Sequence, residues 1–181
     1  MRNIHGRAAA TALAAALLGG ALGTLAPVTA WSDAELTQRD RDFLSKAAQG
    51  GELEVKAGKL ASQRASAPAV RSFGERMVTD HSAANDQLRA LAASKRMPLP
   101  SDLTPEQQKL LGKLESLNGT EFDQSYAAMM VRDHTKDVGE FKHEAHAAKD
   151  PDVKAFATQT LPTLQHHLTM ARQLTKEHEH Q

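Results

Sequence analysis

The chain has 181 residues, a length that suits one domain with its own core, and it carries 22 basic and 22 acidic side chains. This balance of charge argues against nucleic acid as the main partner. The sequence contains no cysteine, which excludes disulfide bonds, thiolate metal ligands, thiol catalysis and a lipid-modified cysteine behind a leader.

Residues 1–30 have the three-part pattern of a signal peptide. Two arginines precede an uncharged run of Ala, Leu and Gly over residues 8–25, and small residues of the cleavage type end at Ala30. We expect cleavage to leave Trp31 as the first mature residue, and we expect a soluble periplasmic or secreted protein with no membrane-spanning segment. The mature residues 31–181 keep 20 basic and all 22 acidic side chains, because only two arginines are removed.

The mature sequence predicts helices throughout. Ala, Leu, Lys, Glu and Gln are plentiful, β-branched and aromatic residues are scarce, and no stretch alternates with a period of two. Proline and glycine interrupt the helical pattern at four places: residues 67–68, 97–100, 118–119 and 150–151. We therefore expect four long helices and one short helix, over residues 33–66, 68–95, 105–117, 120–148 and 151–177.

Two of the expected helical hairpins look like copies of one unit. Residues 68–73 match residues 151–156 at an offset of 83, and each segment starts a helix. Joined by a long crossover that carries the short helix, two such hairpins predict an all-α, ferritin-like four-helix bundle. Gly50 and Gly51 fall in the first helix, where we expect them to let helices approach closely.

Four motifs in a fixed order resemble those of a known family. They are Glu-Val at residues 54–55, Met-Val-Thr-Asp-His at 77–81, Phe-Asp at 122–123 followed by Met-Val-Arg-Asp-His at 130–134, and Leu-Pro-Thr-Leu-Gln-His-His-Leu at 161–168. Over roughly residues 39–175 the chain resembles the exported bacterial family called domain of unknown function 4142. That family is often labelled predicted outer-membrane protein and is grouped with the ferritin-like superfamily. The resemblance implies a fold and an export route, while the family's biochemical role is unassigned.

One ligand-capable side chain falls on the inward face of each long helix, and the distances from Pro68 and Pro151 place the four at similar heights in the bundle. These residues are Glu54, His81, His134 and His167. A carboxylate and three neutral imidazoles suit one first-row transition-metal ion, namely zinc, copper or iron. The candidates for an outer shell that orients them are Asp80, Asp133, Asp137 and Tyr126.

The remaining ligand-capable residues do not reproduce a di-iron site. That site needs Glu-x-x-His motifs in the core, but Glu75 is followed three residues later by Val78, and Glu140 with His143 lies off the inward face. We expect the following ligand-capable side chains to be solvated: Glu140, His143, His146, His166 and residues 177–180. Pro162 should lie on the outer side of its helix and bend it without ending it.

Three functional hypotheses follow from these residues. The first is an exported protein that binds a metal ion or small ligand between its helices. The second is a non-catalytic structural or interaction module with a buried His/Glu network, and the third is a ferritin-like metal-dependent oxidoreductase. No motif identifies a catalytic residue, so the sequence favours a non-enzymatic role without settling it. It names no protein partner and leaves a homo-oligomer open.

Overall fold

The computed structural model describes residues 35–179, with side chains described as far as residue 176. This part of the chain contains five helices. They are α1 (Gln38–Arg64), α2 (Pro68–Ser94), α3 (Pro105–Glu115), α4 (Gly119–Ala147) and α5 (Pro151–Glu179). The prediction of an all-α chain with four long helices and one short helix is confirmed. The predictions for the signal peptide and for the side chains of residues 177–180 lie outside the described part.

The start of α1 is the one boundary that the sequence misplaced by several residues. Residues 35–37 are not helical, and Thr37 caps the helix by accepting a hydrogen bond from the backbone N–H of Asp40 at 3.2 Å. In turn, the Asp40 carboxylate accepts a hydrogen bond from the backbone N–H of Thr37 at 3.0 Å. This reciprocal cap satisfies two donors at the helix terminus, so the expected start at residue 33 was too early.

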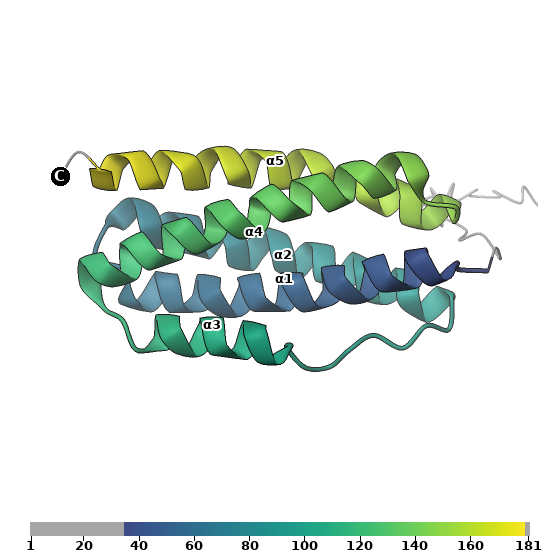
Figure 1. Ribbon diagram of the computed structural model, residues 1–181, viewed down its shortest axis with the longest axis horizontal. Coiled ribbons are helices and arrows are strands. Elements are labelled where there is room, and N and C mark those ends of the chain that lie inside the picture. The colour runs from purple at the N-terminus through teal and green to yellow at the C-terminus, as the bar shows by residue number, and fades with distance from the viewer. Residues whose placement is uncertain (1–34, 180–181) are drawn as a thin grey trace, which may run out of the picture. The chain divides into compact units, whose positions relative to one another are not determined.

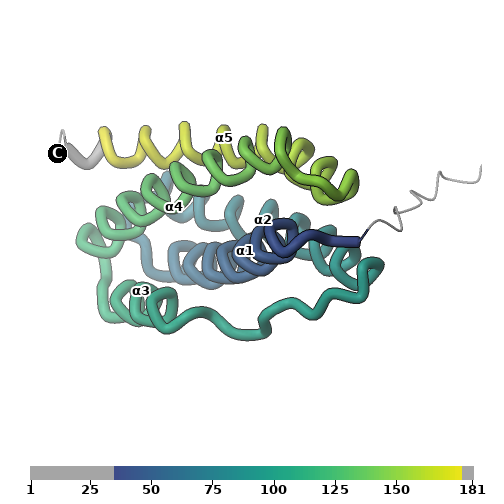
Figure 2. Tube along the Cα trace, turned by 45° about the vertical axis from the view of Figure 1, so that its right-hand side comes forward, coloured from purple at the N-terminus to yellow at the C-terminus, as the bar shows by residue number. Residues whose placement is uncertain are grey.

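The helices form two hairpins that pack into a four-helix bundle. α1 packs along α2 and α4 along α5, and contacts of α2 with α5 and of α1 with α4 hold the two hairpins together. The crossover from α2 to α4 carries α3, which lies against α1 and α4 (Figures 1 and 2). No helix within residues 35–179 is long and apolar enough to cross a membrane.

Two apolar clusters fill the core, one on each side of a layer of buried polar side chains. The Phe73 cluster contains Val70, Phe73 and Tyr126, and the Phe156 cluster contains Val153 and Phe156. The repeat of residues 68–73 at 151–156 predicts that its Val and Phe side chains all face one core, and all four are buried. They lie in different clusters, however, because each copy contributes its first turns to a different end of the bundle.

Small residues bring α1 and α2 together. A Cβ atom added at Gly58 would lie 2.7 Å from the backbone oxygen of Gly74, and one added at Gly51 would meet the side chain of Asn85. The expectation of close approach is correct for Gly51. It is wrong for Gly50, whose Cβ position has no neighbouring atom within 4 Å, because Gly50 faces the edge of a pocket.

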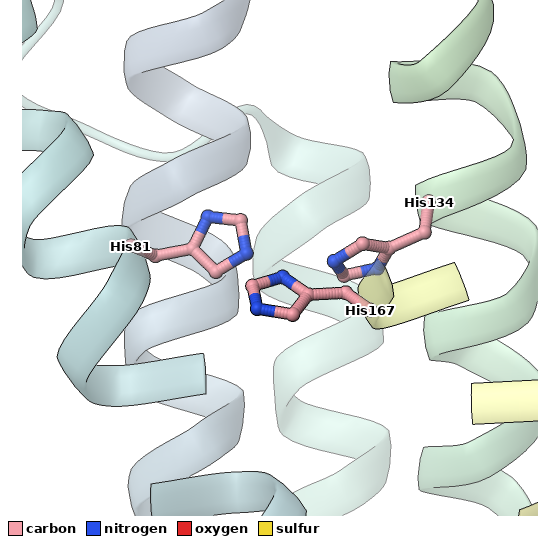
Figure 3. A group of neighbouring side chains, drawn as sticks. All are labelled: His81, His134 and His167. Carbon is pink, nitrogen blue, oxygen red and sulfur yellow. The ribbon is translucent and has the colours of Figure 1, made fainter. Parts of the chain in front are cut away.

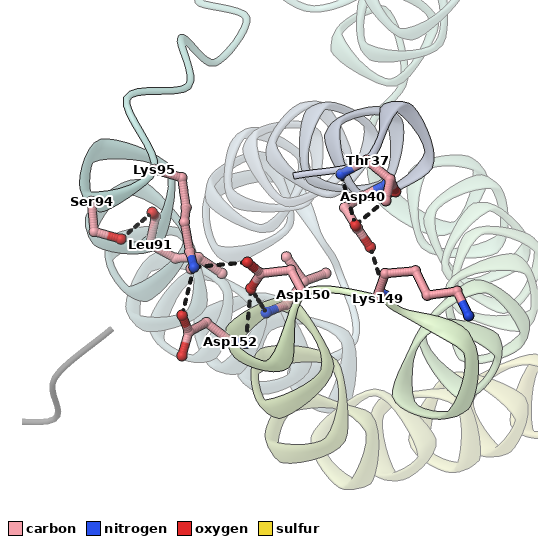
Figure 4. A network of polar contacts seen from close by, with 9 residues as sticks. Thr37, Asp40, Leu91, Ser94, Lys95, Lys149, Asp150 and Asp152 are labelled. Carbon is pink, nitrogen blue, oxygen red and sulfur yellow. Dashed lines mark hydrogen bonds and ion pairs between the residues drawn. The ribbon is translucent and has the colours of Figure 1, made fainter. Parts of the chain in front are cut away.

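Buried ionic contacts fasten the end of the bundle where α4 turns into α5 (Figure 4). The Lys95 ammonium, at the end of α2, lies 2.7 Å from carboxylate oxygens of Asp150 and Asp152. Asp150 also caps α5, accepting from the backbone N–H groups of Asp152 and Val153 at 2.9 and 3.1 Å. Burial alone would lower the pKa of Lys95, but the hydrogen bonds to the two carboxylates hold it above its usual value.

Pro162 lies inside α5 without ending it. Its side chain is exposed, and the helix continues to Glu179. The backbone position without an N–H donor therefore faces away from the core, as the sequence predicted.

Candidate metal centre

Three histidines from three helices meet in the polar layer (Figure 3). His81 comes from α2, His134 from α4 and His167 from α5, and all three side chains are buried. Their ring centroids lie 5.3 to 5.5 Å apart, and one ring nitrogen from each lies within 4.8 Å of the other two. Among the described residues this is the one group of three or more His, Asp or Glu side chains gathered so closely.

In each ring, the nitrogen that points away from the other two rings, here called the outer nitrogen, lies within hydrogen-bonding distance of an acceptor. His81 Nδ1 lies 3.0 Å from Glu54 Oε2, and His167 Nε2 lies 2.8 Å from Asp80 Oδ2. His134 Nδ1 lies 3.1 Å from the backbone oxygen of Met130. Because carboxylates and carbonyl oxygens only accept, each outer nitrogen carries the proton, and this fixes the tautomer of all three neutral rings.

The inner nitrogens have no partner. His81 Nε2, His134 Nε2 and His167 Nδ1 are buried and receive no hydrogen bond. Since the outer nitrogens carry the protons, each inner nitrogen presents a lone pair to the centre of the group. A buried lone pair without a donor is costly, and a lone pair opposite a held N–H is also what a metal ion binds.

The surroundings keep the imidazoles neutral. Burial lowers the pKa of His134 to about 3, and the neighbouring His167 adds to the effect. Burial also places the pKa of His81 well below its usual value, and it lowers that of His167 although Asp80 works against the shift. Neutral imidazole is the form that coordinates a metal, so no proton has to be removed at neutral pH.

Glu54 and Asp137 form a pair of carboxyl groups beside the histidines. Glu54 Oε1 lies 3.4 Å from His134 Nδ1 and receives no hydrogen bond from a donor. The Asp137 carboxyl group faces it within hydrogen-bonding reach. Burial, followed by the negative charge of Asp133, raises the pKa of Asp137 to about 7, and burial followed by the charge of Asp137 raises that of Glu54 well above its usual value. Burial and the closeness of the two acidic groups therefore both favour a proton on the pair.

The structure thus brings the four predicted inward residues together, and it places the four predicted outer residues in different surroundings. Asp80 holds His167 and Asp137 faces Glu54, as described above. Asp133 pairs with Arg132 through Oδ1 at 3.0 Å, and its Oδ2 is buried without a partner. The Tyr126 hydroxyl is also buried without a partner, and burial followed by the charge of Glu54 raises its pKa.

The surface histidines lie where the sequence placed them. The sequence did not predict one hydrogen-bond acceptor of the histidine group. His143, His146 and His166 are exposed. The backbone oxygen of Met130 was not predicted to hold His134, because every helical histidine has a carbonyl four residues before it and residue type gives no signal. Arg76, which pairs with Asp80 at 3.0 Å, could have been found from its spacing of four residues.

The sequence profile of a family described as Domain of unknown function (DUF4142) matches residues 25–174. The chain belongs to this family. The resemblance drawn from the motifs between residues 39 and 175 is thereby confirmed, and the family has no assigned role. No curated protein sequence matches the chain.

A similar fold is found among solved structures. The crystal structure of a DUF305 fragment from Deinococcus radiodurans is similar with a TM-score of 0.69 and 18% sequence identity. The similarity covers 79% of this chain and 99% of that chain. At this level of identity it supports the helical fold and carries no information about function.

Proposed function

We propose that this protein is exported and that its ferritin-like bundle binds one first-row transition-metal ion, of the zinc, copper or iron class. The ligands are the inner nitrogens of His81, His134 and His167. One observation carries the proposal: three buried nitrogens converge without a partner, while an acceptor holds the opposite nitrogen of each ring.

The spacing of the rings suits such an ion. Zinc lies about 2.0–2.1 Å from an imidazole nitrogen, so nitrogens around a tetrahedral ion lie roughly 3.3 Å apart. The inner nitrogens are at most 4.8 Å apart. Each ring therefore has to move inward by about 1 Å or less, which small rotations of the side chains provide. Three protein ligands leave a fourth position for water or a small ligand.

The charges around the rings also suit a dication. Three neutral imidazoles contribute no charge, and the carboxylates of Glu54 and Asp80 at two of the outer nitrogens can supply two negative charges. The sequence predicted Glu54 as a fourth ligand. Its contact with Nδ1 of His81 supports a different role in this proposal, in which Glu54 orients His81 and compensates the charge of the ion.

The two other hypotheses are less well supported. A structural module with a buried polar network leaves three buried lone pairs without donors, which is unfavourable. A di-iron type of oxidoreductase needs Glu-x-x-His motifs in the core. The Glu140 and His143 pair lies instead at the surface, where the His143 side chain is 56% exposed.

Metal analysis of untagged mature protein tests the proposal. After removal of bound metal with a chelator and loading with Zn²⁺, Cu²⁺ or Fe²⁺, elemental analysis should find one tightly held ion per chain. A metal at 100 times its Kd should also stabilise the fold by about 2.7 kcal/mol, because the unfolded chain does not gather the ligands.

Two variants on α4 separate the core from the surface. His134→Ala should lose the bound ion and the rise in melting temperature, whereas His143→Ala on the exposed face should keep both. If both variants respond to metal alike, or if the unmodified protein binds none of the three ions, the buried polar network is the better account.

A further inference from the structure

A pocket leads from the surface to the carboxyl pair of the metal centre. It has a volume of about 390 Å³ and is lined by residues of α1, α3 and α4 and by Thr104. Exposed residues such as Lys46 and Glu106 form its rim, and Glu54 and Asp137 lie in its wall. The pocket thus connects solvent with residues that contact the histidines.

A second, much smaller cavity lies on the inner side of the same pair. It has a volume of about 20 Å³, and its wall includes His81 and Asn85. Glu54 and Asp137 line both spaces, and they are the ionisable side chains that the two spaces share. The carboxyl pair is therefore shared by the open pocket and the small cavity beside His81.

The contacts of this pair indicate what can bind there. The Glu54 side chain lines this pocket and is only 3% exposed, and its Oε1 atom has no donor other than a proton that Asp137 can share with it. An ionised carboxylate only accepts hydrogen bonds, so two carboxylates that face each other need a proton or a cation between them. Oxygen ligands of this kind bind hydrated divalent cations.

We propose that Glu54 and Asp137 form a transfer site, at which a divalent cation that enters through this pocket binds before it reaches the histidine centre. This inference rests on the proposed metal centre. The ionisable residues of the pocket agree with a cation as the occupant, because five acidic side chains face three basic ones. Two of the basic side chains are already paired, Arg132 with Asp133 and Lys136 with Glu140.

The rate at which Co²⁺ enters metal-free protein tests the transfer site. Co²⁺ is a spectroscopic substitute for Zn²⁺, and its visible absorption in stopped flow reports arrival among the imidazoles. Gly50→Leu places a larger side chain at the wall of the pocket, at a position where an added Cβ atom has no neighbour within 4 Å. Asp137→Asn removes one carboxylate with little change in size.

Gly139→Leu is the matched control. Gly139 is also a helical glycine with open space at its Cβ position, it is exposed on α4, and it does not line this pocket. Gly50→Leu and Asp137→Asn should each slow Co²⁺ entry by about tenfold or more, the low end of the range for charge-focused association. Gly139→Leu should load as fast as wild type, and Gly50→Leu should reach the same final spectrum and stoichiometry.

The dependence of the loading rate on ionic strength distinguishes an electrostatic role of Asp137 from a purely structural one. Loading of wild type should slow as ionic strength rises, and Asp137→Asn should show a weaker dependence. If wild type binds one Co²⁺ and both pocket variants load at its rate, the transfer site is wrong while the metal centre stands. If Asp137→Asn loses the bound ion at equilibrium, Asp137 belongs to the final site and the transfer role is also wrong. Wild type that binds no Co²⁺ overturns both proposals.

Discussion

At the scale of single residues, the three imidazoles differ in what holds their outer nitrogens. Two are held by carboxylates, which favour the protonated ring, and His134 is held by a neutral backbone oxygen. The His134 side chain is also fully buried. Burial, followed by the neighbouring His167, lowers its pKa to about 3, although the hydrogen bond to the backbone oxygen of Met130 opposes the shift.

The low pKa of His134 predicts that the stability of metal-free protein depends on pH. The unfolded chain takes up a proton on His134 near pH 6.5, but the native imidazole does so only near pH 3. Stability is therefore lost as the pH falls below 6.5. Between pH 7.5 and 5, the free energy of unfolding of wild type should fall by about 2 kcal/mol relative to His134→Gln.

Comparison with the variant is needed because other groups titrate in the same layer. Titratable side chains of the three other long helices lie against His134: Glu54, His81 and His167. The raised pKa values of Glu54 and Asp137 act in the opposite direction, since these groups gain protons in the native state first. Urea unfolding with a chelator present measures the difference, and parallel pH profiles of the two proteins would contradict a neutral buried His134.

The sequence predicted the members of this site but not its internal arrangement. Helical periodicity gives the face and height of a residue, which is enough to bring Glu54, His81, His134 and His167 together. Which nitrogen of a ring faces inward depends on side-chain rotation and on the neighbouring acceptor. That acceptor comes from another helix for His81 and His167 and from the backbone for His134, so the pattern of residue types does not contain it.

At the scale of elements, helix ends were predictable where a proline marks them, whereas the capped start of α1 and the contacts between helices were less so. α2, α3 and α5 begin at prolines as expected. The close contact of α1 with α2 depends on Gly58 opposite Gly74, where a backbone oxygen occupies the space of a side chain. A single sequence shows that the glycine is there but not what faces it.

This contact predicts opposite effects for two glycine substitutions. Gly58→Ala should destabilise the protein by about 1–3 kcal/mol, because the added methyl group would lie 2.7 Å from the Gly74 oxygen and the helices would have to separate. Gly139→Ala meets open space and should stabilise it by about 0.5–1 kcal/mol through helix propensity. Thermal and urea unfolding measure both changes, and equal effects would show that the helices do not approach this closely.

At the scale of the whole molecule, the sequence predicts export. Residues 1–30 have the pattern of a cleaved signal peptide, so the mature protein should begin at or near Trp31 and be recovered as a soluble species in a periplasmic extract. Intact-mass measurement of the natively expressed protein checks this expectation. Protein that folds and accumulates with Met1 through Ala30 still attached would contradict it.

The two residues of the carboxyl pair occupy equivalent positions in the repeat of the two hairpins. Glu54 lies 14 residues before Pro68, and Asp137 lies 14 residues before Pro151, so the two carboxyl groups occupy the same position in the two copies. In the repeat, each is the counterpart of the other. A symmetric pair of identical hairpins would place one acidic side chain against itself at this point.

The histidines break this symmetry. At the same offset of 83 residues, the counterparts of His81, His134 and His167 are Leu164, Gly51 and Ala84. These three residues line the small cavity on the inner side of the carboxyl pair. The repeat therefore contains two sets of equivalent positions: nitrogen donors occupy one set, and two small residues and a leucine occupy the other. The repeated hairpins thus carry the histidines in only one of the two sets of equivalent positions, whereas each copy contributes one carboxyl group to the pair.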